Sequence, residues 1–228
     1  MDNALLLESR PTRLFWYFST PLGMKALMAA SGAAMFSFLL AHLSGNLLVF
    51  AGRERMDHYS EFLHSMPIVL WAARFGLLAA IGAHIWSAAS LTKKKIEARP
   101  IHYKIRKNRS SSYASRNMIW TGSWIAGFVV FHIAHFTTGS LHGQYQSLKP
   151  FENVVYSFRS PIVSLAYVVT MFLIGMHLFH GLWSMFQSLG WNHPHYDRAL
   201  RRGSMVFSAV VVSGFSSVPV AVLNGWVG

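Results

Sequence analysis

Five long apolar stretches constrain this chain of 228 residues more than any other feature of its sequence. A helix needs about 20 apolar residues to cross the hydrocarbon core of a bilayer. Five stretches meet this requirement, near 25–51, 68–92, 117–138, 161–189 and 205–226. Because a helix satisfies its own backbone hydrogen bonds in lipid, we predict an all-α integral membrane protein. We expect a single domain, 1–228, built as an antiparallel bundle of five transmembrane helices.

The distribution of charged and sulfur-containing residues supports this class. Charged residues make up 12% of the chain, about half the share of an average soluble domain. All eight carboxylates fall outside the five stretches, as the cost of placing a charge in lipid requires. The chain has no cysteine, which excludes disulfides and thiolate-held clusters. Histidine, present twelve times, is therefore the main candidate for binding a metal.

Lysine and arginine are distributed unequally between the two ends of the predicted helices. Fifteen lie in the N-terminal segment and in the loops 93–116 and 190–204, whereas four lie in the other two loops. By the positive-inside rule we predict a multi-pass protein of the cytoplasmic (inner) membrane, with the N-terminus in the cytoplasm and the C-terminus outside. We expect no cleaved signal peptide. This distribution explains the net charge of +12, so the charge does not indicate binding of nucleic acid. We expect the loop 93–116 to contact lipid headgroups or a soluble partner.

Each of the first four stretches contains a histidine at a depth that can be estimated from the helical rise. At 1.5 Å per residue, His84 and His177 both lie about 24 Å from the outer surface. His42 lies about 15 Å and His132 about 9 Å from it. Two tiers of paired imidazoles are what two stacked b-type haems require, with each iron bound by two facing helices. We therefore predict that four of the five helices enclose two haems.

The residues alone also allow these histidines different roles. A single intramembrane histidine can instead form a hydrogen bond with a neighbouring helix. Two of the four are also followed, three residues later, by a second histidine, so that His135 or His180 could ligate in place of the first. Successive positions at this spacing differ in direction by about 60°, so one member of each pair ligates and the other supports.

Short motifs along nearly the whole chain resemble those of one family. They are "AHLSGN" (41–46), "HSMPIVLWAAR" (64–74), "HIWSA" (84–88), "YASRNMIWTG" (113–122), "FHIAHFT" (131–137), "HLFHGLWSMFQSLG" (177–190) and "GFSSVP" (214–219). With them the chain resembles the cytochrome b subunit of succinate dehydrogenase and fumarate reductase, in its five-helix, two-haem b558 branch. The resemblance implies axial ligands and supporting residues. The ligands are His84 and His177 for the inner haem and His42 and His132 for the outer haem, with His135 and His180 in supporting roles.

The resemblance also implies a function and partners. The chain would be the membrane anchor of a succinate:quinone oxidoreductase, the respiratory complex II of the tricarboxylic acid cycle. It would pass electrons between an iron-sulfur subunit and a membrane quinone, which we expect to be menaquinone. A cytoplasmic flavoprotein subunit with FAD would perform the succinate and fumarate chemistry, so we expect no catalytic residue in this chain. The complex could form a higher oligomer.

One position departs from part of the family. Some fumarate reductases carry a glutamate of a proton path two residues before the fourth ligand, where this chain has Gly175. We therefore expect no proton movement by that route. Two rival functions remain, a dihaem anchor of another quinone-linked dehydrogenase and a transporter that uses histidines without haem.

Haem propionates and a quinone need further residues. Propionates need basic or hydroxyl partners near the membrane surfaces. Candidates are Ser115 and Arg116 for the inner haem, assisted by Lys93, and Arg74 for the outer haem. Both arginines could instead extend to the lipid headgroups.

A quinone site requires an apolar slot and a group that exchanges protons. His64, with Glu61 nearby, is a candidate at the outer mouth of the second helix, although a loop histidine is more often simply solvated. A cytoplasmic site is comparably plausible. It would be lined by Trp183, Phe186, Gln187 and the segment 113–116.

Overall fold

Proline marks the start of three of the membrane-length helices. The computed structural model describes residues 17–98 and 112–228. Helices α2 (Pro21–Leu47), α4 (Pro67–Glu97) and α8 (Pro161–Ser188) each have proline in the first turn, where the missing N–H would have no helical partner. At the start of α2 the side chain of Thr20 also accepts a hydrogen bond from the Gly23 N–H at 3.1 Å.

Two helices continue into tighter or wider turns. A 3₁₀ turn, η1 (Leu48–Ala51), extends α2, and a π-helical turn, η2 (Ile133–Thr137), extends α6 (Met118–His132). With α9 (Asp197–Leu223), five helical segments are long and apolar enough to cross a membrane. The described residues contain no strand. The prediction of an all-α protein with five membrane-length helices is therefore confirmed.

The fifth long helix differs from its predicted range near 205–226. It begins at Asp197, because an acidic residue in the first turn is favourable at a helix N-terminus. Arg201 then pairs with Asp197 at 3.3 Å. Apolar length alone could not reveal this charged first part, which precedes the apolar run.

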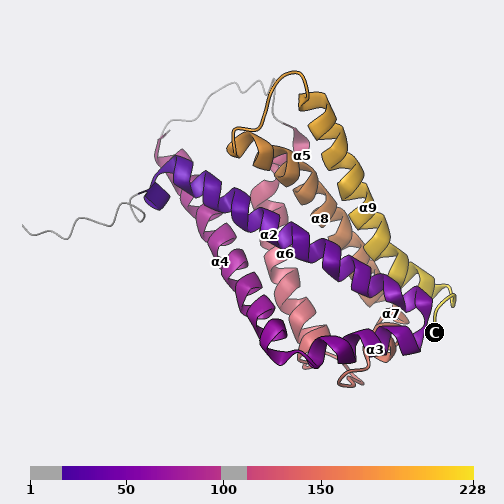
Figure 1. Ribbon diagram of the computed structural model, residues 1–228. Coiled ribbons are helices and arrows are strands. Elements are labelled where there is room, and N and C mark those ends of the chain that lie inside the picture. The colour runs from indigo at the N-terminus through magenta and orange to yellow at the C-terminus, as the bar shows by residue number, and fades with distance from the viewer. Residues whose placement is uncertain (1–16, 99–111) are drawn as a thin grey trace, which may run out of the picture.

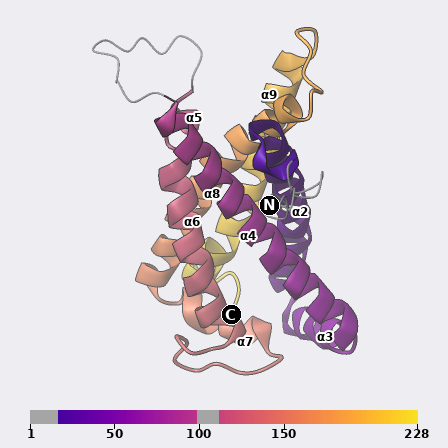
Figure 2. The same ribbon diagram turned by 90° about the vertical axis from the view of Figure 1, so that its left-hand side faces the viewer.

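Three shorter helices were not predicted: α3 (Arg53–His64), α5 (Tyr113–Arg116) and α7 (Pro150–Phe158). Figures 1 and 2 show α3 and α7 together at the end of the bundle opposite α5. The buried carboxylate of Asp57 on α3 accepts a hydrogen bond from the Phe151 N–H at 3.3 Å and lies 3.7 Å from Lys149 Nζ. Asp57 therefore caps α7 and joins the two helices.

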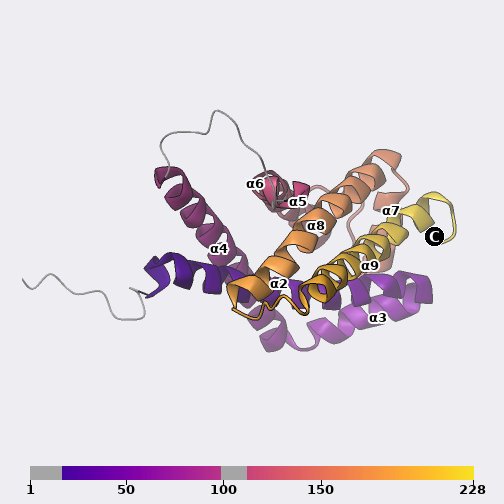
Figure 3. The ribbon, with the colours of Figure 1, turned by 90° about the horizontal axis from the view of Figure 1, so that it is seen from above.

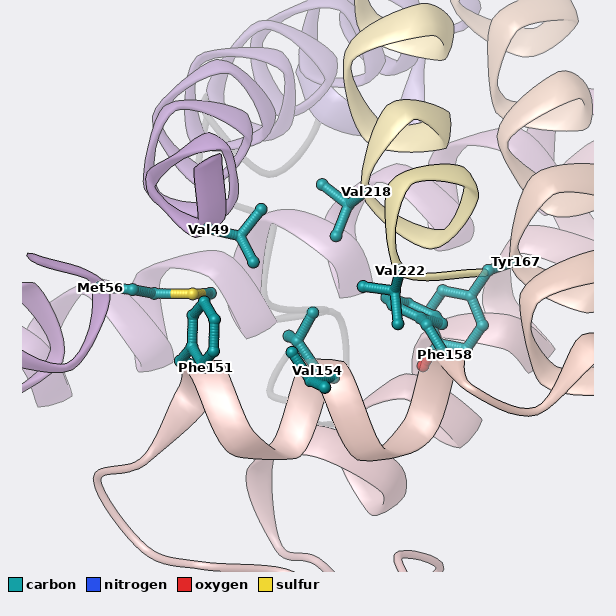
Figure 4. Close-up of a cluster of buried hydrophobic side chains, with 9 residues drawn as sticks. Val49, Met56, Phe151, Val154, Phe158, Tyr167, Val218 and Val222 are labelled. Carbon is teal, nitrogen blue, oxygen red and sulfur yellow. The ribbon is translucent and has the colours of Figure 1, made fainter. Parts of the chain in front are cut away.

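A hydrophobic cluster fastens this end to the long helices. Val49 and Met56 meet the apolar face of α7, and Val218 and Val222 of α9 complete the cluster (Figure 4). Burying one such side chain contributes about 1.5–3 kcal/mol. The cluster therefore holds the ends of α2, α8 and α9 together beside Tyr167.

Helix α2 connects the other long helices, because it packs on α8 and α9 as well as on α4. Helix α8 lies along α9 and contacts α6, whereas α4 packs chiefly on α2. Seen from above, α4 lies apart from α6 (Figure 3). Only Ser87 of the described helix α4 is buried.

Candidate haem-binding site

Two of the predicted ligands, on α4 and α8, face each other. The ring centroids of His84 and His177 are 6.4 Å apart, with an angle of 57° between the ring planes. An imidazole nitrogen lies about 2 Å from a bound metal and about 1 Å from its own centroid, so two opposed ligands place their centroids about 6 Å apart. The observed separation of the inner pair therefore fits one metal ion between two imidazoles.

Helix α2 holds the imidazole of His84. Nδ1 of His84 lies 3.2 Å from the Met28 carbonyl oxygen and 3.3 Å from Ser31 Oγ. A carbonyl can only accept, so Nδ1 carries the proton and donates it. The other nitrogen, Nε2, is then unprotonated and able to bind a metal. A Cβ added to Gly32 would lie 3.5 Å from Cε1 of the ring, an ordinary van der Waals distance, so Gly32 lies beside the imidazole.

Helix α6 holds His177 in the same way. Nδ1 of His177 lies 3.2 Å from Thr121 Oγ1, and that hydroxyl is within 3.1 Å of the Asn117 carbonyl oxygen. When the threonine proton is donated to a carbonyl oxygen of its own helix, the hydroxyl oxygen accepts from the Nδ1–H of His177. A Cβ on Gly122 would lie 3.4 Å from Cε1 of His177. Each inner histidine thus lies at hydrogen-bond distance from a hydroxyl of the preceding long helix, next to a glycine.

The outer pair consists of His42 on α2 and His132 on α6. Their ring centroids are 5.7 Å apart and the rings meet edge to face at 83°. Nδ1 of His132 lies 3.3 Å from the Tyr167 hydroxyl, which leaves Nε2 for a ligand. Nε2 of His42 lies 3.3 Å from Asn46 Nδ2, whose stronger bond is to the His42 carbonyl oxygen at 2.8 Å. A metal at His42 would replace only the longer of these two contacts.

His135 is engaged through both ring nitrogens. Nδ1 lies 3.0 Å from the Tyr167 hydroxyl, and Nε2 lies 3.2 Å from Ser157 Oγ. The side chain is 5% exposed and belongs to the π-helical turn η2. Such turns are frequent at functional sites. Because neither nitrogen of His135 is available, the geometry favours His132 as the ligand of this pair.

His180 is placed differently. Its Nδ1 is buried and has no hydrogen-bond partner among the described residues, and its ring lies 6.2 Å from that of Trp183. Leaving such an atom unpaired costs about 1–3 kcal/mol. The atom is therefore free to bind a polar group, and the supporting role of His180 stays a prediction.

The candidate propionate partners make local contacts. The guanidinium of Arg74 lies 5.0 Å from the ring centroid of Trp71 on the same helix. Ser115 Oγ donates to the Ser112 carbonyl oxygen at 2.8 Å, and Arg116 lies over Tyr113 at 6.0 Å. Lys93 is 3.8 Å from Glu97. These contacts do not connect them to the four histidines.

The two candidate quinone sites differ in their surroundings. Trp183 and Gln187 line one pocket of about 530 Å³, together with residues around the start of α9. Trp183 Nε1 donates to Asp197 Oδ1 at 2.9 Å, and the guanidinium of Arg201 lies 3.8 Å from the centroid of the indole ring. Phe186 lies beside Trp191 at 6.4 Å.

The outer quinone candidates lie at the end of α3 and are exposed. Nδ1 of His64 donates to the Ser60 carbonyl oxygen at 2.8 Å, and Glu61 lies 3.8 Å from His58. These contacts are all within one helix.

Sequence reasoning missed the residues that hold the ligands. The sequence does contain a signal for Ser31 and Thr121. Each is followed by a glycine, and a predicted ligand follows that glycine ten residues later: His42 after Gly32, and His132 after Gly122. Tyr167 has no local signal, since its partners lie on another helix.

The donor set distinguishes between metals. Within residues 17–98 and 112–228, no three histidine or carboxylate side chains gather at one point. A tetrahedral zinc site needs more protein ligands than a pair supplies, whereas a haem iron takes only its axial ligands from the protein. The residues present therefore fit haem better than zinc.

Comparison with known proteins identifies no relative of this chain. The chain matches no protein-family model, no curated protein and no solved structure.

Proposed function

We propose that the chain is the dihaem cytochrome b anchor subunit of a succinate:quinone oxidoreductase, either a succinate dehydrogenase or a fumarate reductase. The observation that carries this proposal is two pairs of neighbouring imidazoles, with ring centroids 6.4 and 5.7 Å apart, contributed by four different helices. The motif resemblance supports the choice of enzyme class. The anchor of another quinone-linked dehydrogenase is the alternative within electron transfer.

Each residue has a defined task in this proposal. His84 and His177 bind the inner haem iron and His42 and His132 the outer one, all through Nε2. The haems supply one-electron oxidation and reduction. Hydrogen bonds to Nδ1 would fix the orientation of three of the imidazoles, those of His84, His132 and His177. Arg74, Ser115 and Arg116 remain candidates for the propionates.

The quinone, which we expect to be menaquinone, would bind in the pocket of Trp183 and Gln187. Trp183 lies six residues beyond His177 on α8, about 9 Å along the helix axis. The aromatic ring offers the flat apolar wall that a quinone ring needs. The outer candidates, His64 and Glu61, are exposed and form their polar contacts within α3.

The partners would be a flavoprotein with FAD and an iron-sulfur subunit, both on the cytoplasmic side. Helix α5, the C-terminal end of α4 and the start of α9 lie at one end of the bundle (Figure 1), and residues at the start of α9 line the pocket. That end also carries the lysines that close α4. In the orientation predicted from basic residues it faces the cytoplasm, where the iron-sulfur subunit would dock. A partner that delivers electrons there reaches the inner histidine pair first.

The test is purification of the intact complex from membranes, followed by haem extraction and a reduced-minus-oxidised spectrum. We expect two haems b per chain, together with a flavin-containing and an iron-sulfur subunit. His84→Ala should lose the inner haem only. His58→Ala, which changes an exposed histidine on α3, is the matched control and should retain both haems. A colourless complex would refute the proposal and favour the transporter function.

A further inference from the structure

A hydroxyl and a glycine recur at equivalent places on α2 and α6. The hydroxyl of Ser31 on α2 lies 3.3 Å from Nδ1 of His84, and that of Thr121 on α6 lies 3.2 Å from Nδ1 of His177. In each helix the next residue is a glycine beside the same ring. In both helices the glycine is followed ten residues later by the histidine of the outer pair. Each helix therefore holds one inner imidazole and supplies one outer imidazole. Two independent occurrences of this arrangement indicate a role in positioning.

We propose that Ser31 and Thr121 are positioning residues for the inner pair, and that Thr121 has the larger effect on its redox equilibrium. The inference rests on the proposed function. Both hydroxyls are bonded to carbonyl oxygens of their own helices, so their oxygens face the imidazoles as acceptors. An acceptor at Nδ1 fixes the tautomer, sets the orientation of the ring and raises the basicity of Nε2.

The two sides of the inner pair are not equivalent. Nδ1 of His84 also has the Met28 carbonyl oxygen, which no side-chain substitution removes. Nδ1 of His177 has Thr121 Oγ1 as its one hydrogen-bond acceptor among the described residues. Removal of the threonine hydroxyl therefore leaves the His177 N–H without a partner, whereas removal of the serine hydroxyl does not do this to His84. The threonine substitution should consequently have the larger effect.

A purely structural role for these hydroxyls makes a different prediction. Serine and threonine in transmembrane helices often bond to a carbonyl one turn back without any further function. Thr170 on α8 has no hydrogen bond to any of the four histidines: it is buried, donates to the Ala166 carbonyl oxygen at 2.8 Å and accepts from Trp124 Nε1 at 3.1 Å. It lies outside the four-histidine set. Thr170→Val is therefore the control for loss of a buried threonine hydroxyl.

The experiment compares Thr121→Val, Thr121→Ser, Ser31→Ala and Thr170→Val in the intact membrane complex. The readouts are haem content, redox titration of each haem, and the electron paramagnetic resonance spectrum of the oxidised inner haem. A more basic ligand favours ferric iron, so Thr121→Val should favour the reduced form. From the net worth of one hydrogen bond, we expect its reduced-to-oxidised ratio at a fixed potential to rise roughly two- to tenfold.

The remaining variants complete the comparison. Thr121→Ser keeps the acceptor and should restore the wild-type titration, Ser31→Ala should shift it less than Thr121→Val, and the outer haem should titrate unchanged throughout. An inner haem that titrates and resonates identically in Thr121→Val and Thr170→Val would overturn the inference. That result leaves the proposed function intact, whereas a wild-type complex without haem would remove both.

Discussion

The hydroxyl group of Tyr167 on α8 lies 3.0 Å from Nδ1 of His135. The same oxygen lies 3.3 Å from Nδ1 of His132, so one phenol serves both histidines of the doublet. A phenol has one proton to donate and can also accept. If Nε2 of His132 binds a metal, its Nδ1 donates to the tyrosine and the tyrosine donates to His135. The supporting histidine and the ligand are thereby connected through a neighbouring helix.

Tyr167→Phe should weaken the outer site and the fold around it. The change removes the partner of His132 and leaves Nδ1 of the buried His135 unpaired, at a cost of about 1–3 kcal/mol. We expect a lower melting temperature of the complex in detergent and a loss of outer haem before inner haem during unfolding. Tyr156→Phe, a change on the less buried face of α7, serves as the control. Equal loss of both haems would contradict the local role.

The two histidines of the doublet should respond differently to substitution. His132→Ala should remove the outer haem and leave the inner one. His135→Asn should retain both haems but lower stability, because Ser157 and Tyr167 lose part of their hydrogen bonding. Haem content per chain and the spectrum at low temperature distinguish the two variants. Retention of both haems in His132→Ala would transfer the ligand role to His135.

Gly175 should tolerate no side chain. A Cβ at this position would collide with Val212 Cγ2 of α9, where α8 and α9 pack closely. Gly175→Ala should therefore destabilise the protein by about 1–3 kcal/mol, as overpacking does, and Val212→Ala in the same chain should restore part of this. Thermal unfolding in detergent is the measurement. A glutamate here would require the two helices to separate.

Asp57 should stabilise helix α7 at the end of the bundle that carries α3 and α7. Asp57→Ala removes the acceptor for the Phe151 N–H and the partner of Lys149, so α7 loses its cap at a cost of about 0.5–2 kcal/mol. Hydrogen exchange of the α7 backbone should accelerate. The exposed carboxylate Glu61 on α3 offers a matched control, Glu61→Ala, which should not change α7. If hydrogen exchange of α7 is unchanged in Asp57→Ala, hydrophobic packing alone stabilises this helix.

Trp183→Leu tests the proposed quinone pocket. The substitution removes the indole under Arg201 and the hydrogen bond to Asp197, so the KM for quinone should rise while haem content stays at two per chain. His64→Ala on α3 probes the competing outer site. A raised KM in His64→Ala with no change in Trp183→Leu would move the quinone to that side.

The long helices could be predicted because a run of about 20 apolar residues has few alternatives to a membrane helix. The short helices α3 and α7 could not, since a polar or mixed segment between two spans resembles a loop until its partners are known. Asp57, for example, gains its role only from the nearby N-terminus of α7. The start of α9 at Asp197 was missed for the related reason that charged turns extend beyond the apolar run.

The four histidines could be arranged in two levels from helical rise alone, but their immediate partners could not. The placement of His135 relative to His132 depends on the π-helical turn after His132, for which no sequence rule exists. The contact of His135 with Tyr167 depends on the packing of α6 on α8. Ser31 and Thr121 are residue types that are common in membrane helices. Only their equal spacing to His42 and His132 distinguishes them in the sequence.

The ten-residue interval in α2 and α6 sets a length as well as a pattern. Ten residues of α-helix measure about 15 Å, and intact backbone hydrogen bonds make that length almost inextensible. Two haems bound at the ends of these helical segments would keep a constant distance from each other, even when α2 and α6 tilt in a thinner or thicker bilayer. The rate of electron transfer between the two haems would then be insensitive to the lipid composition around the protein.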